Sequence, residues 1–505
     1  MKEKIIKLVF GPQKAAQIQH AIQPPDTSVN ELKVSLAPEY PIRHIPITAA
    51  TTTTAADQTK TKSKESLKAR RAWTNWAKNQ TCHPLKTLQP RTLEDVVEIV
   101  KNAKADINKI RCVTEGYTWS STSVVDDDGL LVFVNKMTKI YTPVYDESQG
   151  WTVELETGVC FGGVLALGSH GAATQSRTLS DLACEVKIVD ATGTLNTFTR
   201  DKDPVEFSVA ACNLGLLGVI YSYTLRVEPM FNLSVSDSYP LLMDVFDCPK
   251  QAGARLKEMV LQNDQTQILY WPFNSHYKCK GETVTVRYAK DELWIKQWKQ
   301  PDQPESVTFA WKLHRRVRQY IASALGSSTF RLMVVKPKTV RVLSGLFHRE
   351  LKRPAEKILA APDAIHYMAN LEAAVVIGLE CVFKVDEGFE KAVKAWRFAV
   401  DKIYEYAAKG EYPVNMTVDM RFIKSSDQIM SYVYDEDPEA IFCTMEILAL
   451  SQCIGAKLWE HIPGIVPHLR EHAGPQMDRF ESIRKKYDPQ GIFLNKTFAG
   501  VLGHK

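Results

Sequence analysis

The segment from Gly158 to Gly171, GVCFGGVLALGSHG, constrains the fold of this chain more than any other stretch. It holds five glycines, and two of them, Gly162 and Gly163, are adjacent. Adjacent glycines let the main chain approach a bulky group, and freed backbone N–H groups can hold an anionic ligand together with Ser169 and Thr174. The segment therefore indicates either a ligand-binding loop or a tight turn at the edge of a sheet.

Length and charge limit the class of protein. At 505 residues the chain is long enough for two or three domains, and its net charge of +5 gives no case for nucleic acid as a partner. The ten cysteines are scattered without paired spacing, which favours reduced thiols. No apolar run has the length of a membrane span, and the N-terminal stretch is a poor signal peptide. We therefore expect an intracellular protein, either cytoplasmic or mitochondrial and membrane-associated.

Helical and strand patterns alternate from about residue 71 onward. Helices are expected at residues 92–105, capped by Thr92, and at residues 388–408. Strands are expected at residues 110–114, 130–135, 151–156, 184–190, 374–383 and 414–423. Residues 1–66 include Pro24-Pro25 and the run Thr51–Thr54, and they cannot bury enough apolar surface to fold alone. The mixture predicts an α+β fold that changes character near residue 230.

Six short motifs occur in order along the chain: Asn75-Trp76, Pro90–Val96, the loop after Val113, Gly162–Gly171, Gly215–Ile220 and Asp488–Asn495. Together they resemble the vanillyl-alcohol-oxidase-type (PCMH-type) FAD-binding flavoproteins, and among them the aldonolactone oxidases. The resemblance implies a two-subdomain PCMH-type FAD-binding domain at residues 67–229 and an antiparallel-sheet cap (substrate) domain at 230–470. A partly disordered N-terminal extension, residues 1–66, precedes them, and residues 471–505 return to the FAD domain.

The resemblance assigns FAD contacts to several segments. The implied FAD-binding residues are Thr114, Glu115, Gly116, Tyr117, Thr118, Ser120, Ser121, Gly162, Gly163, Ser169, His170, Gly171, Thr174, Gly218, Ile220 and Asn495. The chain contains neither a G-x-G-x-x-G nor a G-x-x-x-x-G-K motif. We therefore expect loop N–H groups, rather than a Rossmann or P-loop site, to hold the pyrophosphate.

Two residues of the implied pyrophosphate loop depart from the family pattern. Tyr117 stands where many members carry a histidine that is bonded covalently to the flavin, so we expect a non-covalent FAD, although a tyrosyl link is chemically possible. Glu115 stands where a small residue is usual, and a carboxylate that faced a diphosphate would be repelled.

The family's Glu-x-Arg pair on a cap strand matches Asp419-Met420-Arg421. Alternate residues of a strand share one face, so both side chains can point at one substrate. The resemblance implies that Arg421 stabilises negative charge on the reduced flavin or binds lactone oxygens, and that Asp419 orients the substrate hydroxyl or the arginine. A surface cross-strand charge pair is the alternative. Lys457 matches the lysine of the family's His-Trp-x-Lys motif, and it would polarise a substrate oxygen or lie solvated on a helix.

These matches imply an FAD-dependent oxidoreductase that oxidises a CH–OH group of a sugar lactone or related polyol by hydride transfer to the flavin, similar to D-arabinono-1,4-lactone oxidase. Electrons would pass to O2 or to another acceptor, such as a protein or a quinone. The alternative is a non-catalytic or altered-specificity relative that keeps the flavoprotein fold. Tyr117, Glu115 and the short link between Gly158 and Gly162, where the family carries a longer helical segment, motivate that alternative.

Two further patterns indicate other chemistry. The motif His468-Leu-Arg-Glu471-His472 fits the H-x-x-E-H helix of zinc peptidases, but Pro467 and Gly474-Pro475 leave barely two helical turns, so we expect no metal site. Trp311 to Pro354 is basic, with eleven Lys or Arg against Glu350 alone. This region predicts either contact with an anionic membrane surface or a solvated helix on the cap.

Overall fold

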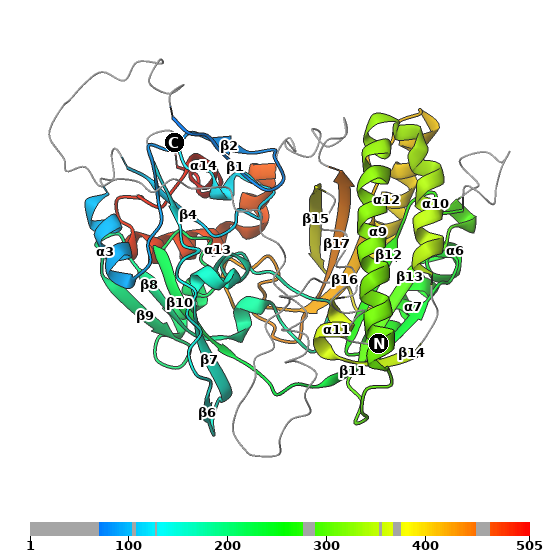
Figure 1. The fold of residues 1–505 in the computed structure, drawn as a ribbon, viewed down its shortest axis with the longest axis horizontal. Coiled ribbons are helices and arrows are strands. Elements are labelled where there is room, and N and C mark those ends of the chain that lie inside the picture. Colours follow the sequence, from blue (N-terminus) through cyan, green and yellow to red (C-terminus); the bar gives the residue numbers. More distant parts are fainter. Residues whose placement is uncertain are drawn as a thin grey trace, which may run out of the picture. The chain divides into compact units, whose positions relative to one another are not determined.

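The computed structural model describes residues 70–103, 108–126, 129–275, 288–352, 356–366, 375–450 and 465–504. The expected N-terminal extension therefore lies outside the described residues. Helices and strands are mixed along the rest of the chain, and most strands belong to antiparallel sheets (Figure 1). The α+β class predicted from the sequence is confirmed.

A small parallel sheet lies near the start of the described chain, in the order β3 (Lys86–Leu88), β5 (Leu130–Phe133), β4 (Ile110–Val113). Helix α3 (Leu93–Asn102) connects β3 to β4. Its capping box is formed by Thr92, whose hydroxyl accepts from the Asp95 N–H, and by the Asp95 carboxylate, which accepts from the Thr92 N–H. The expected start of this helix is confirmed. A two-stranded ribbon, β1 (Trp73–Thr74) and β2 (Thr81–Cys82), precedes it.

A five-stranded antiparallel sheet follows, in the order β6 (Val144–Asp146), β7 (Gly150–Glu156), β10 (Val219–Arg226), β8 (Ala183–Val189), β9 (Leu195–Thr199). Strands β8 and β9 form a hairpin, and Asp190 closes its turn by accepting from the Thr192 and Thr194 N–H groups. Helices α5 (Pro204–Ala210), α13 (Ile465–Tyr487) and α14 (Lys496–Leu502) share a hydrophobic core with this sheet. The C-terminal segment is therefore part of the same packed layer.

The second large sheet has seven antiparallel strands, in the order β14 (Glu356–Ala360), β11 (Asn232–Ser238), β13 (Trp294–Lys299), β12 (Gln265–Tyr270), β16 (Val418–Lys424), β17 (Ile441–Leu450), β15 (Val376–Lys384). Helices α7 (Pro249–Leu261) and α12 (Glu390–Ala408) cover one face, where Trp396 packs in the same core as Ile268 and Met420. Neighbouring side chains of each strand point to the opposite face. The chain enters this sheet after β10, and the predicted domain bounds stay a prediction.

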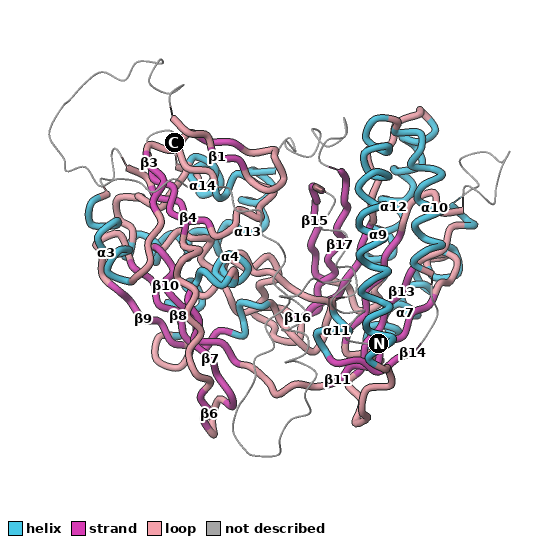
Figure 2. The backbone as a smooth tube through the Cα atoms, viewed as in Figure 1, coloured by secondary structure: helices cyan, strands magenta, loops and turns pink. Residues whose placement is uncertain are grey.

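The basic segment forms two helices, α9 (Phe309–Val335) and α10 (Val340–Leu351), which Figure 2 shows as neighbouring helical tubes. Phe330 and Met333 of α9 and Val340 of α10 belong to the core of the seven-stranded sheet. The remaining short helical elements are η1 (Ser121–Ser123), η2 (Thr157–Val159), α4 (Phe161–Ala166), η3 (Leu179–Leu182), α6 (Leu242–Val245), η4 (Tyr288–Lys290), η5 (Pro337–Thr339) and α11 (Ala361–Ile365).

The helices and the cysteines can be compared with what the sequence predicts. Within the described ranges, no helix has both the length and the apolar character needed to cross a membrane. The eight cysteines of the described residues are free thiols, as their scattered spacing predicts. Cys160, Cys248 and Cys381 are exposed.

Arg111 joins three distant segments of the first half. Its Nη1 donates to the carbonyls of Gly215 at 2.9 Å and Phe493 at 3.0 Å, and its Nη2 donates to the Leu214 carbonyl at 3.0 Å. The residue is 6% exposed, and burial lowers its pKa to about 10, so the guanidinium stays charged at neutral pH. The turn before β10 and the C-terminal segment are therefore held to β4 by one side chain.

We expect Arg111→Met to reduce the free energy of unfolding by about 3 kcal/mol, because three buried carbonyls lose a charged donor. Urea unfolding followed by circular dichroism measures the change. Arg91→Met, at an exposed position, is the control and should change stability by less than about 0.5 kcal/mol. Equal stability of the two variants would show that Arg111 does not hold these segments together.

Candidate active site

The two segments expected at the pyrophosphate meet in the structure. Strand β4 leads into residues 114–121, and β7 leads through η2 into α4. Thr114 and Glu115 lie near Cys160, and burial, followed by the charge of Glu115, raises the pKa of this thiol. The glycine segment is helical from Phe161 to Ala166, which corrects its interpretation as a continuous loop.

The glycines of this segment have different surroundings. A Cβ atom at Gly162 would lie 1.9 Å from the Thr157 Oγ1 atom, so close packing excludes a larger residue there. Gly163 and Gly171 have open space, because a Cβ atom on either would meet nothing within 4 Å. Thr174 is buried, yet its Oγ1 has no hydrogen-bond partner among the described residues. Open space beside the main chain and an unpartnered buried hydroxyl fit a bound group such as FAD.

The loop after β4 is held by both ends of the described chain. Gly116 has a φ of +75°, a conformation that favours glycine. Asn75 Nδ2 donates to the Thr118 carbonyl at 2.7 Å, and Asn495 Nδ2 donates to the Ser121 carbonyl at 3.1 Å. The Asn495 amide is thus engaged in placing this loop.

The hydroxyls of this loop are engaged too. Ser121 Oγ lies 2.7 Å from Thr497 Oγ1, and Ser120 Oγ lies 3.0 Å from Thr122 Oγ1. Ser169 uses its backbone N–H for the Val164 carbonyl at 3.1 Å. These contacts fix the loops locally and leave FAD binding by these residues a prediction.

Tyr117 and Glu115, the two departures from the family pattern, have exposed side chains. Tyr117 is 75% exposed, and its ring centroid lies 5.8 Å from that of Trp76. The Glu115 Oε1 atom accepts a hydrogen bond from Asn135 Nδ2 at 3.2 Å. The Glu115 carboxylate therefore has a donor of its own, which offsets part of the expected repulsion toward a diphosphate.

Gly218 and Ile220 lie at the start of β10. A Cβ atom at Gly218 would lie 2.2 Å from the Val189 carbonyl oxygen, and its φ is +155°. The Ile220 side chain is 7% exposed and belongs to the core beside the five-stranded sheet. Only the main chain of Ile220 is therefore available to a ligand.

Asp419 and Arg421 share one face of β16, as the strand spacing predicts. The Asp419 Oδ2 atom accepts from Arg421 Nε at 2.8 Å, from Arg421 Nη2 at 2.5 Å and from Gln267 Nε2 at 2.6 Å. The Asp419 side chain is 3% exposed, and its buried Oδ1 has no partner among the described residues. The alternative of a surface charge pair is therefore wrong.

Three carboxylates lie side by side across neighbouring strands. Asp419 on β16 is paired with Glu446 on β17, and Glu446 is paired with Glu380 on β15. We call Asp419, Glu446 and Glu380 the carboxylate row. Thr444, two residues before Glu446, is paired with Arg421 on the same face. The sequence analysis missed Glu380, Glu446 and Thr444.

The carboxylates of the row differ in their basic partners. Glu380 Oε1 lies 3.0 Å from His170 Nε2, and His170 Nδ1 lies 2.7 Å from the Gly171 carbonyl. The His170 ring is therefore held between the Glu380 carboxylate and the Gly171 carbonyl. Among the described residues, Glu446 has one ion-pair partner, Arg421 Nη2 at 3.4 Å.

The pKa values of Glu446 and Glu380 follow from their burial and from these partners. The pKa of Glu446 is raised to about 7 by the balance of several effects: burial raises it most, Arg421 lowers it, and the charges of Asp419 and Glu380 raise it. Burial would also raise the pKa of Glu380, but the hydrogen bond and charge of His170, with Arg421, hold it below the ordinary value. The middle carboxylate of the row is therefore the one that titrates near neutral pH.

Segments of the first half approach this face of the seven-stranded sheet. A Cβ atom at Gly378 of β15 would lie 2.8 Å from the Trp119 ring and 3.1 Å from Glu446 Oε1. The Tyr432 hydroxyl donates to the Gly168 carbonyl at 2.7 Å, and its ring packs edge-on against His170. The loop after β4, the glycine segment and the carboxylate row are therefore neighbours.

Backbone contacts strengthen this junction. Residue Ala173 forms a β-bridge with Gln265, and the Thr266 N–H donates to the Ala172 carbonyl at 3.1 Å. Nearby, the Lys424 N–H donates to the Ser176 carbonyl at 3.4 Å. The segment 172–176 thus joins the main chains of β12 and β16. Lys457, the third expected catalytic residue, lies outside the described residues, and its role stays a prediction.

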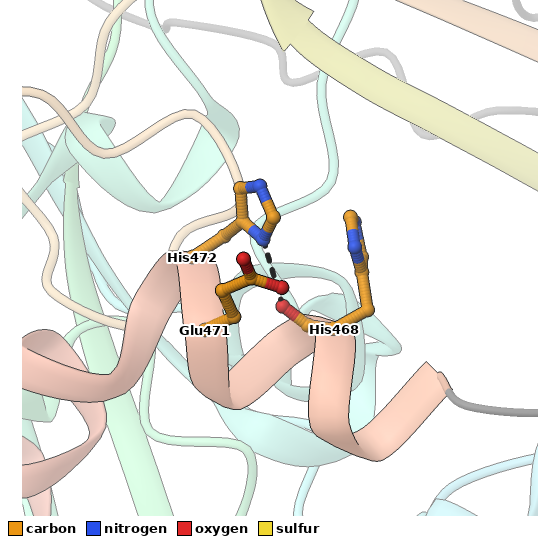
Figure 3. A group of neighbouring side chains, drawn as sticks. All are labelled: His468, Glu471 and His472. Carbon is orange, nitrogen blue, oxygen red and sulfur yellow. Dashed lines mark hydrogen bonds between the residues drawn. The ribbon is translucent and has the colours of Figure 1, made fainter.

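The three residues of the H-x-x-E-H motif gather on α13, where Figure 3 shows His468, Glu471 and His472 on one side of the helix. Their possible ligand atoms lie within 4.8 Å of one another, and all three residues are exposed. Ala473 has non-helical dihedral angles (φ −125°, ψ 16°), so α13 consists of two helical stretches that meet at a kink just before Gly474-Pro475, and the stretch that carries the motif is short, as expected. The expected absence of a metal site stays a prediction.

Known proteins were compared with this chain. No family model matches it. It is 21% identical over 472 residues to the L-gulonolactone oxidase of Scyliorhinus torazame, which covers 84% of this chain and 97% of that protein. It is 20% identical over 480 residues to the L-gulono-1,4-lactone dehydrogenase of Mycobacterium tuberculosis, which covers 85% and 99%. A D-arabinono-1,4-lactone oxidase of Saccharomyces cerevisiae is 26% identical over 185 residues, which are 32% of this chain and 35% of that protein.

A solved cholesterol oxidase from Brevibacterium sterolicum has a similar fold, with a TM-score of 0.64, 15% identity and coverage of 86% of this chain and 97% of the other. Fold and relatives together define an FAD-dependent oxidoreductase of the vanillyl-alcohol-oxidase type, with a PCMH-type FAD-binding fold. Over most of its length the chain is similar to lactone oxidases and dehydrogenases, in agreement with the family that the sequence motifs resemble.

The raised pKa of Glu446 predicts a pH-dependent stability difference. A carboxyl whose pKa is higher in the folded state destabilises that state as pH rises from the unfolded value of 4.5 toward about 7. We expect Glu446→Gln to gain up to roughly 3 kcal/mol over the wild type at pH 8 and almost nothing at pH 4.5. Urea unfolding at both pH values measures this difference. Glu436→Gln, at an exposed position, should show no such gain, and a pH-independent difference for Glu446→Gln would contradict the assignment.

Proposed function

We propose that this protein oxidises a CH–OH group of a sugar lactone or related polyol, using FAD as the hydride acceptor. Its full-length relatives are named for L-gulonolactone and L-gulono-1,4-lactone, and a partial relative is named for D-arabinono-1,4-lactone. Electrons pass from the flavin to O2 or to another acceptor, because the relatives include both oxidases and a dehydrogenase.

The observation that carries the proposal is the buried Asp419–Arg421 pair beside the glycine segment. A buried ion pair with an unpartnered carboxylate oxygen costs stability unless a further group satisfies it. A substrate hydroxyl would donate to Asp419 Oδ1, while Arg421, whose side chain is 26% exposed, would place its positive charge near oxygens of the substrate. The pair therefore suits recognition of a polyhydroxylated molecule.

The residues of the first half fit the cofactor. The open space at Gly163 and Gly171 and the free hydroxyl of Thr174 would take parts of FAD, with the loop 114–121 at the pyrophosphate. When it is bound, FAD supplies the hydride acceptor. A non-covalent attachment follows from Tyr117 at the position of the family's linking histidine.

The second candidate, a non-catalytic relative, remains distinguishable by experiment. Glu115 and the short link between β7 and α4 favour it, because both alter the segments expected at the flavin. The buried Asp419–Arg421 pair favours catalysis, because a chain without a substrate has no use for an unsatisfied buried carboxylate oxygen.

The purified protein is expected to be yellow and to release its flavin into the supernatant on acid precipitation. Arg421→Ala should lower kcat/KM on L-gulono-1,4-lactone or D-arabinono-1,4-lactone by about 10² to 10³-fold, because a charge-stabilising donor is lost. Its flavin content should match that of the wild type. Arg255→Ala removes an exposed arginine of α7 and should leave turnover unchanged.

Other outcomes would decide against parts of this proposal. Colour that stays in the pellet would mean a covalent link. A colourless protein that cannot be reconstituted with FAD would support the non-catalytic relative, and unchanged turnover of Arg421→Ala would remove Arg421 from the site. The intracellular location expected from the sequence also stays a proposal, which cell fractionation tests.

A peripheral membrane contact is a further part of the proposal. Where α9 meets α10, exposed apolar side chains lie among exposed basic ones: Val335 is 68% exposed, Val342 46% and Leu346 50%, and the cations are Lys336, Lys338 and Arg349. Val342, Leu346 and Arg349 follow helical spacing on α10, so they share one side. Such a face suits an anionic lipid surface, where each cation adds about 1 kcal/mol.

We expect the protein to sediment with vesicles that contain phosphatidylserine and much less with phosphatidylcholine alone. The double variant Lys336→Glu/Lys338→Glu should lower the bound fraction at least tenfold, because two attractive charges become repulsive. Lys394→Glu, which changes an exposed lysine of α12, is the matched control. Equal binding of both variants would contradict the proposed contact.

A further inference from the structure

We propose that Glu446 is a further catalytic residue, which accepts the proton of the substrate hydroxyl during oxidation. The inference rests on the proposed function. Nothing in the sequence motifs points to Glu446, because it lies in the apolar run Ile441–Leu450 without a family signature. The cross-strand pairing places it between Asp419 and Glu380, on the face that carries Arg421.

The other carboxylates of the row are less suited to accept a proton. Asp419 Oδ2 already accepts from three N–H groups, and the Asp419 side chain is 3% exposed. Glu380 is engaged by His170 Nε2 at 3.0 Å. Asp419 therefore orients Arg421 and a substrate hydroxyl, and Glu380 acts as a positioning residue that holds His170.

Glu446 combines partial exposure with an oxygen that no donor among the described residues occupies, whereas Asp419 is almost fully buried and Glu380, although its side chain is 29% exposed, is bound by His170. Its side chain is 16% exposed, and its Oε2 lies 3.4 Å from Arg421 Nη2. In the described part of the chain its Oε1 has no hydrogen-bond partner, and this oxygen lies beside Gly378, where the absence of a side chain admits the Trp119 ring. Glu446 thus offers an accessible oxygen next to the arginine that would bind the substrate.

Titratable and charged groups face Glu446 from several elements and set its pKa. They are Glu380 from β15, Asp419 and Arg421 from β16, His170 from the glycine segment and Tyr432 from the loop after β16. Burial raises the pKa of Tyr432, so its phenol stays neutral. With a pKa of about 7, Glu446 is partly ionised at neutral pH, where a general base is most effective.

The proton and the electrons of the step balance as follows. The C–H bond of the substrate breaks, and its hydrogen leaves with both electrons to the oxidised flavin that the proposed function supplies. The O–H bond breaks, and its proton passes to the Glu446 carboxylate, while the electron pair left on oxygen forms the C=O bond. Arg421 stabilises the negative charge that develops on this oxygen.

The test compares Glu446→Gln with Glu380→Gln over the pH range. In the wild type, kcat/KM is expected to rise with pH through about 7, as Glu446 loses its proton. Glu446→Gln should lose this rise and lower kcat at pH 8 by about 10² to 10³-fold, with little change in KM. Glu380→Gln removes a repulsive neighbour, so it should move the rise to lower pH without abolishing it. Glu446→Asp keeps a carboxylate and should recover part of the rate.

Infrared spectroscopy supplies a second measurement that does not depend on turnover. The C=O stretch of a protonated carboxyl should fade in the wild type as pH rises through about 7, and Glu446→Gln should lack this band. A band that persists in Glu446→Gln, or a rise of kcat/KM that this variant keeps, would overturn the assignment of Glu446. In that case a wild type that still oxidises lactones would leave the proposed function standing. A wild type that binds FAD but oxidises no hydroxyl would contradict both the proposed function and the role of Glu446.

Discussion

The register of the seven-stranded sheet is the constraint on which the site depends. Strands β12, β16, β17 and β15 are paired so that Gln267, Arg421 and Thr444 meet in one row, and Asp419, Glu446 and Glu380 in the next. A slip of one residue in any strand would turn its polar side chains into the core beneath α7 and α12. Side chains on that opposite face, such as Met420, pack in one core with Trp396 of α12, and this packing fixes which residues line the face of the site.

Like charges directly opposite each other destabilise a sheet, and here three carboxylates adjoin. The structure limits this repulsion in two ways: Arg421 and His170 bind the carboxylates at the two ends of the row, and the pKa of the middle carboxyl is raised to about 7, so it is only partly ionised at neutral pH. Proteins break local rules of this kind mainly at functional sites, where the cost is offset elsewhere. In this chain the aromatic core around Trp396 and Phe246 is well placed to offset it.

Much of the fold follows from local patterns in the sequence. Thr92 and Asp95 predict the start of α3, alternation predicts β7, β8 and β16, and strand spacing predicts that Asp419 and Arg421 share a face. The carboxylate row could not be predicted in this way, because it needs the pairing of strands that are remote in sequence. His170 and Glu380 are 210 residues apart, and no local rule brings them together. The one local signal was a polar pair at alternate positions, Thr444 and Glu446, within an otherwise apolar strand.

The helical start of the glycine segment shows the opposite limit. Gly162 and Gly163 argue against a helix by propensity, yet close packing of Gly162 on Thr157 holds α4 in place. Tertiary contacts have decided the local structure there. Sequence reasoning identified the right segment for a physical reason, the need for small residues, and assigned it the wrong conformation.

The bridge between Ala173 and Gln265 makes the segment 172–176 a spacer of fixed length. One end continues from the glycine segment, and the other is tied through Ser176 to the end of β16. Side chains along it can change where they are exposed, but an inserted or deleted residue would break the bridge to Gln265 or the hydrogen bond from Lys424 to Ser176. Evolution can therefore vary the composition of this spacer far more readily than its length.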